Sequence, residues 1–218
     1  SAGWVMSWAD YLGLTDLSYY DNTDAGGSSY ISHVGHAAAA IAAGTCDVVL
    51  VTLAGRPRTG SLPPRGTPPE SGFEDVFGLT TVGGYALAAR RHMHEFGTTS
   101  EQLAEVRVAA SEHAQYNEHA MYREPVTVDE VVGSRLVADP LHLLDCCVVS
   151  DGGGALVVVS EDVAADLDRE CPRVLGHGEA IKHADGGDVD LTYTGAVESG
   201  PRAFAEAGCA VKPFLARP

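Results

Sequence analysis

The chain has 218 residues, enough to bury a core of its own, and 45% of them are hydrophobic while 20% are charged. The formal net charge is −16 and the pI is about 4.7, and so acidic a surface repels nucleic acid phosphates and anionic lipids. The longest apolar stretch, Ala37–Leu53, is broken by Gly44 and Asp47, which argues against a transmembrane helix. We therefore expect neither nucleic acid nor a membrane as a partner.

The cysteine content favours a reduced protein. The five cysteines are Cys46, Cys146, Cys147, Cys171 and Cys209. Their number is odd, none forms a Cys-x-x-Cys pair, and a chain of this size does not need disulfide bonds to fold. No signal peptide is visible, so a cytoplasmic location is expected.

The first third of the chain alternates between helical and β-prone segments. Val5–Leu12 has the apolar spacing of a helix, and Asp16–Tyr20 is a short β-prone run. A glycine-containing turn then leads into Tyr30–Ala43, which is apolar on nearly every side and predicts a helix buried all round. The β-branched run Cys46–Leu53 suits a strand covered on both faces. Strand, helix and strand together predict a βαβ unit in a parallel sheet.

Residues 56–139 interrupt this strand pattern. Arg56–Gly72 is too rich in proline and glycine for regular structure. Three helices are expected after it: Leu79–Phe96, Thr99–His113 and Val126–Val132. The second of these is predicted to begin with Ser100 as its N-cap.

The strand pattern resumes at Asp145–Val159. The run Asp151–Gly154 precedes a strand rather than a helix, so it lacks the helix N-terminus that a phosphate-binding loop needs. Pro172–Ile181 predicts a further strand, and Glu198–Ala207 predicts a helix with Pro201 in its first turn.

Four segments, in this order, resemble the sterol-carrier-protein-X-type thiolases and the bacterial lipid-transfer-protein aldolases of the thiolase superfamily. They are GGSSYISHVGHAAAAIAAGTCDVVLV (26–51), ALAARRHMHEFGTTSEQLAEV (86–106), YREPVTVDEVV (122–132) and ADPLHLLDCCVVSDGGGALVVVSED (138–162). The resemblance implies an α/β thiolase fold of two βαβαβαββ halves, with a helical loop domain inserted before the last strand of the first half. Residues 1–55 and 140–165 would form the first half, residues 56–139 the loop domain, and residues 166–218 the start of an incomplete second half.

The chain departs from catalytic thiolases at the nucleophile. Those enzymes carry a cysteine where the chain enters the buried helix, because the helix N-terminus lowers the pKa of the thiol. The resemblance places that position at Gly27, which has no side chain to acylate. Ser28 follows, and its hydroxyl would need a neighbouring general base. Acyl transfer through a cysteine is therefore not expected, and the aldolase branch is also glycine-rich here.

The predicted substrate site is the turn formed by Gly26, Gly27, Ser28 and Ser29. Its glycines let a backbone approach a ligand closely, and N–H groups at a helix start attract an oxyanion. The structural alternative is a tight turn with Ser28 as the helix cap. Arg56 and Arg58 are candidates for the positive patch that coenzyme A needs. The resemblance implies retro-aldol cleavage of a 3-hydroxyacyl-CoA in steroid or lipid side-chain degradation.

Two alternative functions stay open. One is an acetyl-CoA acyltransferase or thiolase homologue with Ser28 as a weak candidate nucleophile, and the other is a non-catalytic, truncated subunit. The resemblance also implies a homodimer and a partner subunit of the zinc-ribbon/OB-fold kind. A coenzyme A thioester would be the substrate, with no bound cofactor. His33 and His36 lack an obvious third ligand, so they are interpreted as packed or capped histidines and no metal is expected.

Overall fold

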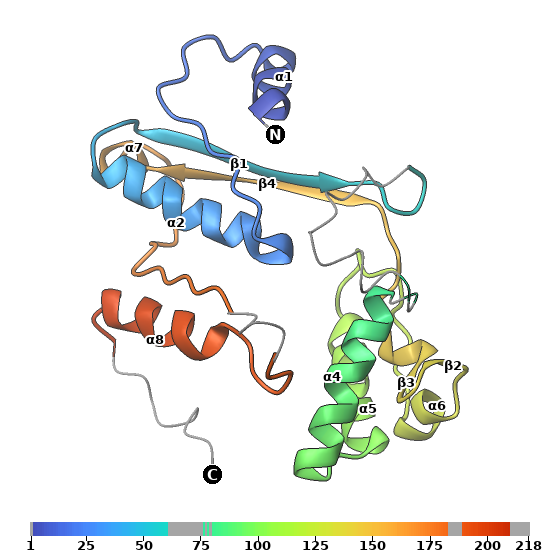
Figure 1. Cartoon of the computed structure of the whole chain (residues 1–218). Coiled ribbons are helices and arrows are strands. Elements are labelled where there is room, and N and C mark those ends of the chain that lie inside the picture. Colours follow the sequence, from blue (N-terminus) through green and yellow to red (C-terminus); the bar gives the residue numbers. More distant parts are fainter. Residues whose placement is uncertain (1, 61–75, 77, 79, 183–188, 210–218) are drawn as a thin grey trace. The chain divides into compact units, whose positions relative to one another are not determined.

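A computed structural model describes the chain except for residues 1, 61–75, 77, 79, 183–188 and 210–218. It divides into two compact units. The first unit contains Ser1–Thr59, Asp151–His183 and Gly195–Pro218, and the second contains Gly60–Ser150 and Ala184–Thr194 (Figure 1). The domain boundaries implied by the resemblance stay a prediction.

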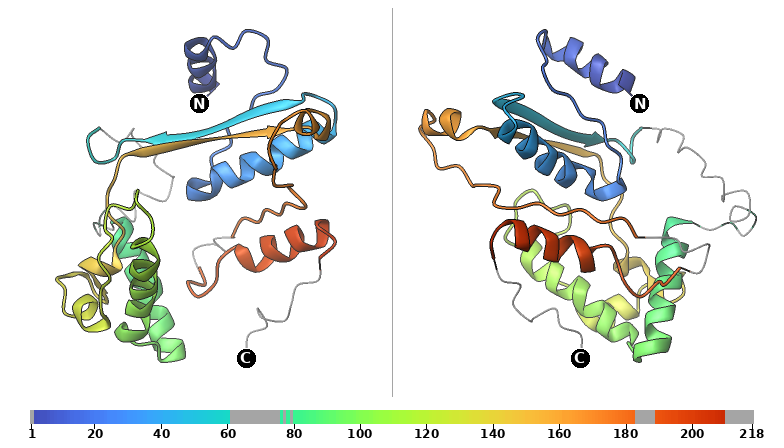
Figure 2. Two further views of the ribbon diagram at one scale, coloured as in Figure 1. Left: turned by 180° about the vertical axis from the view of Figure 1, so that it is seen from behind. Right: turned by 60° about the vertical axis from the view of Figure 1, so that its left-hand side comes forward.

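The first unit is built around a two-stranded sheet formed by β1 and β4. The elements of this unit are α1 (Ala2–Leu12), η1 (Gly26–Ser28), α2 (Ser29–Ala42), β1 (Val48–Gly55), β4 (Gly152–Val159), α7 (Glu161–Ala165) and α8 (Ala196–Glu206). β1 and β4 pair along their whole length, from Val48 opposite Val159 to Gly55 opposite Gly152. α2 packs against both strands, and α1 lies on the other side of the sheet (Figures 1 and 2).

The prediction of a parallel sheet is wrong for the described residues. β1 and β4 run antiparallel, and Asp16–Tyr20 forms no strand, so no βαβ unit is present there. The reason lies in the topology. In a βαβαβαββ half the last two strands follow one another with no crossover helix between them, and strands connected in this way run antiparallel. The resemblance implies that β1 and β4 are such a pair and that the loop-domain insertion separates them in sequence.

The helix and strand at the centre of this unit exist where the sequence predicts them, but they are less covered than expected. In α2 only Ser32, Gly35 and Ala37 are buried, while Ile31 is 57% exposed. In β1 only Val51 is buried. The predictions of a helix buried all round and of a strand covered on both faces are therefore wrong for this chain, because the described residues do not supply enough neighbours.

The segment predicted as a strand at Pro172–Ile181 is extended but forms no strand, since no described strand pairs with it. It packs instead against α8. A Cβ on Gly176 would lie 2.3 Å from the carbonyl oxygen of Ala203, and a Cβ on Gly178 would lie 2.2 Å from that of Ser199. Glycine is thus required at both positions for this close approach. Pro201 lies in the interior of α8, so its predicted place in the first turn is also wrong.

The second unit is mainly helical, as predicted. Its elements are α4 (Thr81–Phe96), α5 (Ser100–Ala114), α6 (Val128–Val132), β2 (Leu136–Ala138), β3 (Leu141–His142) and η3 (Leu143–Asp145). The N-cap of α5 is Thr99 rather than Ser100. The Thr99 hydroxyl accepts a hydrogen bond from the Gln102 N–H, and the Gln102 side chain accepts one from the Thr99 N–H, which makes a complete capping box.

All five cysteines are free in the structure, and their reduced state stays a prediction. Cys146 is half-buried and Cys147 is exposed. Among the described helices, none combines the length and the apolar character that a membrane crossing requires.

Candidate functional site

The glycine turn, Gly26–Ser29, is held by hydrogen bonds within itself and to its immediate neighbours. Gly26 adopts a positive φ of 71°, and its N–H donates to Asp24 Oδ1 over 2.9 Å. The Ser29 hydroxyl accepts from the Ala25 N–H at 2.9 Å and donates to the Gly26 carbonyl at 2.7 Å. The Ser28 hydroxyl donates to the Ala25 carbonyl at 3.1 Å. Ser28 therefore does not cap α2 with its side chain, and Ser29 holds the turn in place.

This turn offers backbone rather than side-chain chemistry. Gly27 is exposed, and a Cβ built on it would meet nothing within 4 Å. The turn leads into the N-terminus of α2, where the helix dipole and the first N–H groups favour a negatively charged oxygen. The Ser28 hydroxyl points to a carbonyl instead of a base, so the geometry does not favour Ser28 as a nucleophile.

No cysteine lies at this turn in the part of the chain that the structure describes. Cys46 follows the opposite, C-terminal end of α2. Cys146 belongs to the second unit, where its thiol donates to the carbonyl of His142 over 3.4 Å. A thiol suited to acyl transfer is thus missing from the position at which a helix N-terminus would activate it.

Arg56 and Arg58 follow the last residue of β1. The chain reverses direction between α2 and β1, so the start of α2 and the end of β1 lie at the same end of the sheet (Figure 1). Asp151 anchors the segment there: its carboxylate accepts a hydrogen bond from the Arg58 N–H at 2.8 Å and another from the Thr59 hydroxyl. The structure therefore places the two predicted arginines and the glycine turn at one end of the unit. Their role in binding coenzyme A stays a prediction.

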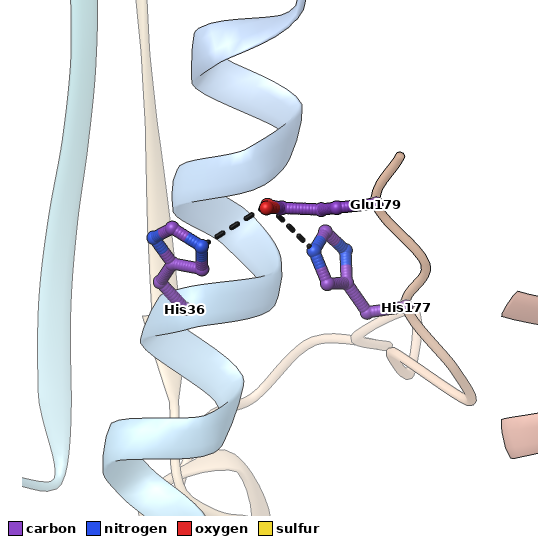
Figure 3. A group of neighbouring side chains, drawn as sticks. All are labelled: His36, His177 and Glu179. Atoms are coloured by element: carbon purple, nitrogen blue, oxygen red, sulfur yellow. Dashed lines mark hydrogen bonds and ion pairs between the residues drawn. The ribbon is translucent and has the colours of Figure 1, made fainter. Parts of the chain in front are cut away.

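A second group of polar side chains lies further along α2. The Nε2 atom of His36 is 3.0 Å from Glu179 Oε1, and the Nε2 atom of His177 is 2.9 Å from the same oxygen (Figure 3). The three ligand atoms all lie within 4.8 Å of one another. We call these three residues the His-His-Glu cluster.

Two further side chains hold this cluster. His36 Nδ1 is 2.5 Å from Asp21 Oδ2, and the Ser32 hydroxyl donates to Glu179. Partial burial opposes ionisation of Asp21, but hydrogen bonds from Thr23 and His36 outweigh it and lower the pKa of Asp21 to about 2. The hydrogen bonds from Ser32 and His177 lower the pKa of Glu179. Both carboxylates are therefore ionised at neutral pH.

The extended backbone at residues 176–179 explains why His177 and Glu179 point the same way. In an extended chain, alternate side chains face opposite sides. Gly176 and Gly178 face α8, so His177 and Glu179 face α2. The His177 ring packs directly on Gly35, where a Cβ would come within 2.2 Å of it. A glycine on α2 is thus needed to admit the ring.

Sequence reasoning missed His177 and Glu179. It treated His33 and His36 as a pair, but His33 Nε2 lies 3.0 Å from the carbonyl of Thr23, outside the cluster. A signal was present in His177-Gly178-Glu179, since residues two apart on an extended segment share a face. Nothing in the sequence indicates that this face meets His36.

A cavity of about 530 Å³ lies against β1. It is lined by α1, by the segment that precedes the glycine turn, and by strand residues, with Trp8, Leu12, Tyr19 and Val49 among its walls. Burial and the neighbouring Asp21 raise the pKa of Tyr19, so its hydroxyl stays protonated. The cavity contains none of the residues predicted from the sequence to bind substrate.

Comparison with known proteins identifies several relatives of this chain. The chain is 39% identical over 167 residues to a steroid side-chain-cleaving aldolase of Thermomonospora curvata, a match that covers 71% of this chain and 43% of that protein. The solved structure of an Ltp2-ChsH2(DUF35) aldolase superimposes with a TM-score of 0.77 and 33% identity, over 93% of this chain and 55% of that chain. A monomeric SCP2-thiolase-like protein type 1 from Mycobacterium smegmatis has a TM-score of 0.68 and 21% identity, over 94% and 45% of the two chains, and shows the fold alone.

These comparisons define the class of protein. No family model matches the chain. The fold is thiolase-like, as the sequence motifs predict. The chain belongs to the branch that contains the sterol-carrier-protein-2-type thiolases and the lipid-transfer-protein aldolases. It spans about half the length of the relatives it matches.

Proposed function

We propose that the protein is a thiolase-like component of an enzyme that cleaves a 3-hydroxyacyl-CoA by a retro-aldol reaction, with a steroid or another bulky lipid as the acyl group. One observation carries this proposal: a glycine turn stands at the start of α2, and no described thiol lies there. The relationship to a protein named as a steroid side-chain-cleaving aldolase supports it.

Retro-aldol cleavage needs no nucleophile on the enzyme. A base removes the proton from the 3-hydroxyl group, a carbonyl forms there, and the bond between C2 and C3 breaks. Its electron pair passes into the thioester as an enolate, which is then protonated at C2 to give a shortened acyl-CoA and a ketone or aldehyde. The charge gathers on the thioester oxygen. Backbone N–H groups at the start of α2 suit that charge, because they are fixed before the reaction begins.

The base is a separate requirement. The hydroxyls of Ser28 and Ser29 already donate to backbone carbonyls, so we assign the base to neither of them.

Binding of the coenzyme A part is proposed for Arg56 and Arg58. The chain as a whole carries a net charge of −16, so an anionic ligand requires a local group of positive charges. Both arginines follow the end of β1, which lies at the same end of the sheet as the start of α2 (Figure 1). The reaction chemistry requires the thioester as substrate and no separate cofactor.

We also propose that the working enzyme contains a partner subunit of the zinc-ribbon/OB-fold kind and that the thiolase-like chain forms a homodimer in the cytoplasm. The similar solved aldolase is named for two components, Ltp2 and ChsH2(DUF35), which supports a second subunit here. Exposed apolar residues of the first-unit sheet, such as Leu156 at 53% and Val157 at 62%, are consistent with a covering protein surface in the assembly.

The direct test is a product assay. The full-length protein, with its partner subunit, is incubated with a steroid 3-hydroxyacyl-CoA and the products are separated by liquid chromatography and mass spectrometry. We expect a shortened acyl-CoA and the matching ketone or aldehyde. The proposal is wrong if the only products are those of thiolysis, formed from a 3-ketoacyl-CoA and free coenzyme A.

A variant in the glycine turn tests whether its backbone N–H groups contribute to the cleavage. Gly27→Val adds a bulky side chain in open space, so the fold should tolerate it while the backbone N–H groups become shielded. We expect a large loss of cleavage with unchanged circular dichroism. Gly84→Ala, a substitution in open space within α4, is the matched control and should leave activity unchanged.

A further inference from the structure

We propose that His36, His177 and Glu179 form a binding site for a divalent transition metal ion of the zinc class, supported by Asp21 as an outer carboxylate. The site uses none of the residues of the glycine turn. It is therefore independent of the retro-aldol proposal, and it departs from the sequence-based expectation that no metal is bound.

Two of the three ligand separations in the cluster suit such an ion, and all three ligand atoms lie within 4.8 Å of one another. Two ligand atoms that each lie about 2.0–2.1 Å from a tetrahedral zinc ion are separated by roughly 3.3 Å. Glu179 Oε1 lies 3.0 Å from His36 Nε2 and 2.9 Å from His177 Nε2, so these two pairs need to separate by only a few tenths of an ångström. Two histidines and one glutamate also form a ligand set that binds zinc with a fourth position left for water.

The surroundings of His36 favour a positive charge between two carboxylates, which either a proton on the ring or a bound metal ion supplies. Its Nδ1 faces Asp21 at 2.5 Å and its Nε2 faces Glu179 at 3.0 Å. A neutral imidazole has only one N–H, so one nitrogen would turn a lone pair toward a carboxylate oxygen. A metal ion at Nε2 removes this conflict, because Nδ1–H then donates to Asp21 while the Nε2 lone pair binds the ion. This carboxylate–histidine–metal arrangement is the usual outer support of a histidine ligand.

The charges and the positions of the ligands suit a divalent metal ion. The carboxylates of Asp21 and Glu179 together balance a divalent ion. The side chains of His36 and His177 are only 32% and 25% exposed, so they are largely held in place before binding. His36 belongs to α2, whereas His177 and Glu179 belong to the extended segment that packs on α8. A bound ion would therefore tie two parts of the first unit together and stabilise it.

The test uses the untagged full-length protein after treatment with a chelator. Zn²⁺ is titrated by calorimetry, and Co²⁺ is added in parallel as a spectroscopic probe. We expect one ion per chain, a visible Co²⁺ spectrum of the four-coordinate type, and a higher melting temperature with Zn²⁺ present. His177→Gln and Glu179→Gln should each remove the binding, and Asp21→Asn should weaken it by about 10- to 100-fold.

His119→Gln is the matched control, because the His119 side chain is 87% exposed and lies in the second unit. It should bind Zn²⁺ as the wild type does. The proposal is overturned if the wild type binds no Zn²⁺, or if folded His177→Gln and Glu179→Gln proteins bind it unchanged. If either variant fails to fold, the wild-type Co²⁺ spectrum decides: a six-coordinate, hydrated spectrum overturns the site. If no Zn²⁺ binds, a proton on the His36 ring supplies the positive charge between Asp21 and Glu179.

Discussion

The two groups of functional interest on α2 are built in opposite ways. The glycine turn is local, since each of its hydrogen bonds joins residues no more than four positions apart. The His-His-Glu cluster joins α2 to a segment near the other end of the sequence. A local site depends on the conformation of a few residues, whereas the cluster depends on the packing of α2, the extended segment and α8. The glycine turn should therefore keep its conformation when the packing changes, whereas the His-His-Glu cluster should lose its geometry.

The largest effect is expected from placing a thiol in the turn. Gly27→Cys puts sulfur at the start of α2 in open space, where the helix N-terminus lowers the pKa of a thiol. We expect its alkylation by iodoacetamide at pH 7 to be about tenfold faster than that of an ordinary exposed cysteine. Thr45→Cys, just beyond the C-terminal end of α2, is the matched control. Equal rates at the two positions, measured by peptide mass spectrometry, would show that the turn does not stabilise anions.

The cluster is most sensitive at Gly35. An alanine there would bring its Cβ within 2.2 Å of the His177 ring, so the ring and its segment must move. We expect Gly35→Ala to lower the free energy of unfolding by about 1–3 kcal/mol and to weaken Zn²⁺ binding. Gly84→Ala, with no atom near its Cβ, should instead stabilise by about 0.4–1 kcal/mol. Urea denaturation measures both, and a neutral Gly35→Ala would contradict the observed packing.

A smaller effect is expected at the start of α5, another local feature. Thr99→Ala removes the hydroxyl that accepts the Gln102 N–H and should cost about 1 kcal/mol of stability. Ser100→Ala should change the free energy of unfolding by no more than about 0.5 kcal/mol, because Thr99 and not Ser100 caps the helix. The two variants are compared by chemical denaturation. If Ser100→Ala is the more damaging, the assignment of the cap is wrong.

The smallest effect concerns Asp151, which holds the end of β1 across a long sequence separation. The hydrogen bond from Thr59 lowers the pKa of this carboxyl below its ordinary value. A lowered folded-state pKa gives stability that is present above the unfolded-state pKa of about 3.9 and is lost as the pH falls through the folded-state value. We therefore expect Asp151→Asn to be less stable than the wild type near pH 7, with the difference shrinking below about pH 4. A difference independent of pH would contradict the shift.

Sequence reasoning succeeded where the signal is local. The helix spacing in Tyr30–Ala43, the β-branched run after Gly44, and the family motifs around Gly27 each depend on neighbouring residues. They led to the correct helix, strand and thiolase-like fold.

Sequence reasoning failed where the structure of a segment depends on residues far away in the sequence. Asp16–Tyr20 and Pro172–Ile181 have strand-like residues, but a strand also needs a neighbour, and the described residues provide none. The direction of β4 relative to β1 follows from the topology of the connection rather than from either strand. The contact of His177 and Glu179 with His36 likewise follows from packing on Gly35 and α8. Only the folded chain reveals these relationships.

The proposed retro-aldol function depends most on the absence of a thiol at the start of α2. Mass spectrometry of the intact protein after incubation with a 3-ketoacyl-CoA and with acetyl-CoA tests this directly. We predict that the mass stays unchanged with both thioesters, because retro-aldol cleavage forms no acyl-enzyme. The addition of one acyl group, located by peptide mapping at Ser28 or at any cysteine, would contradict the account.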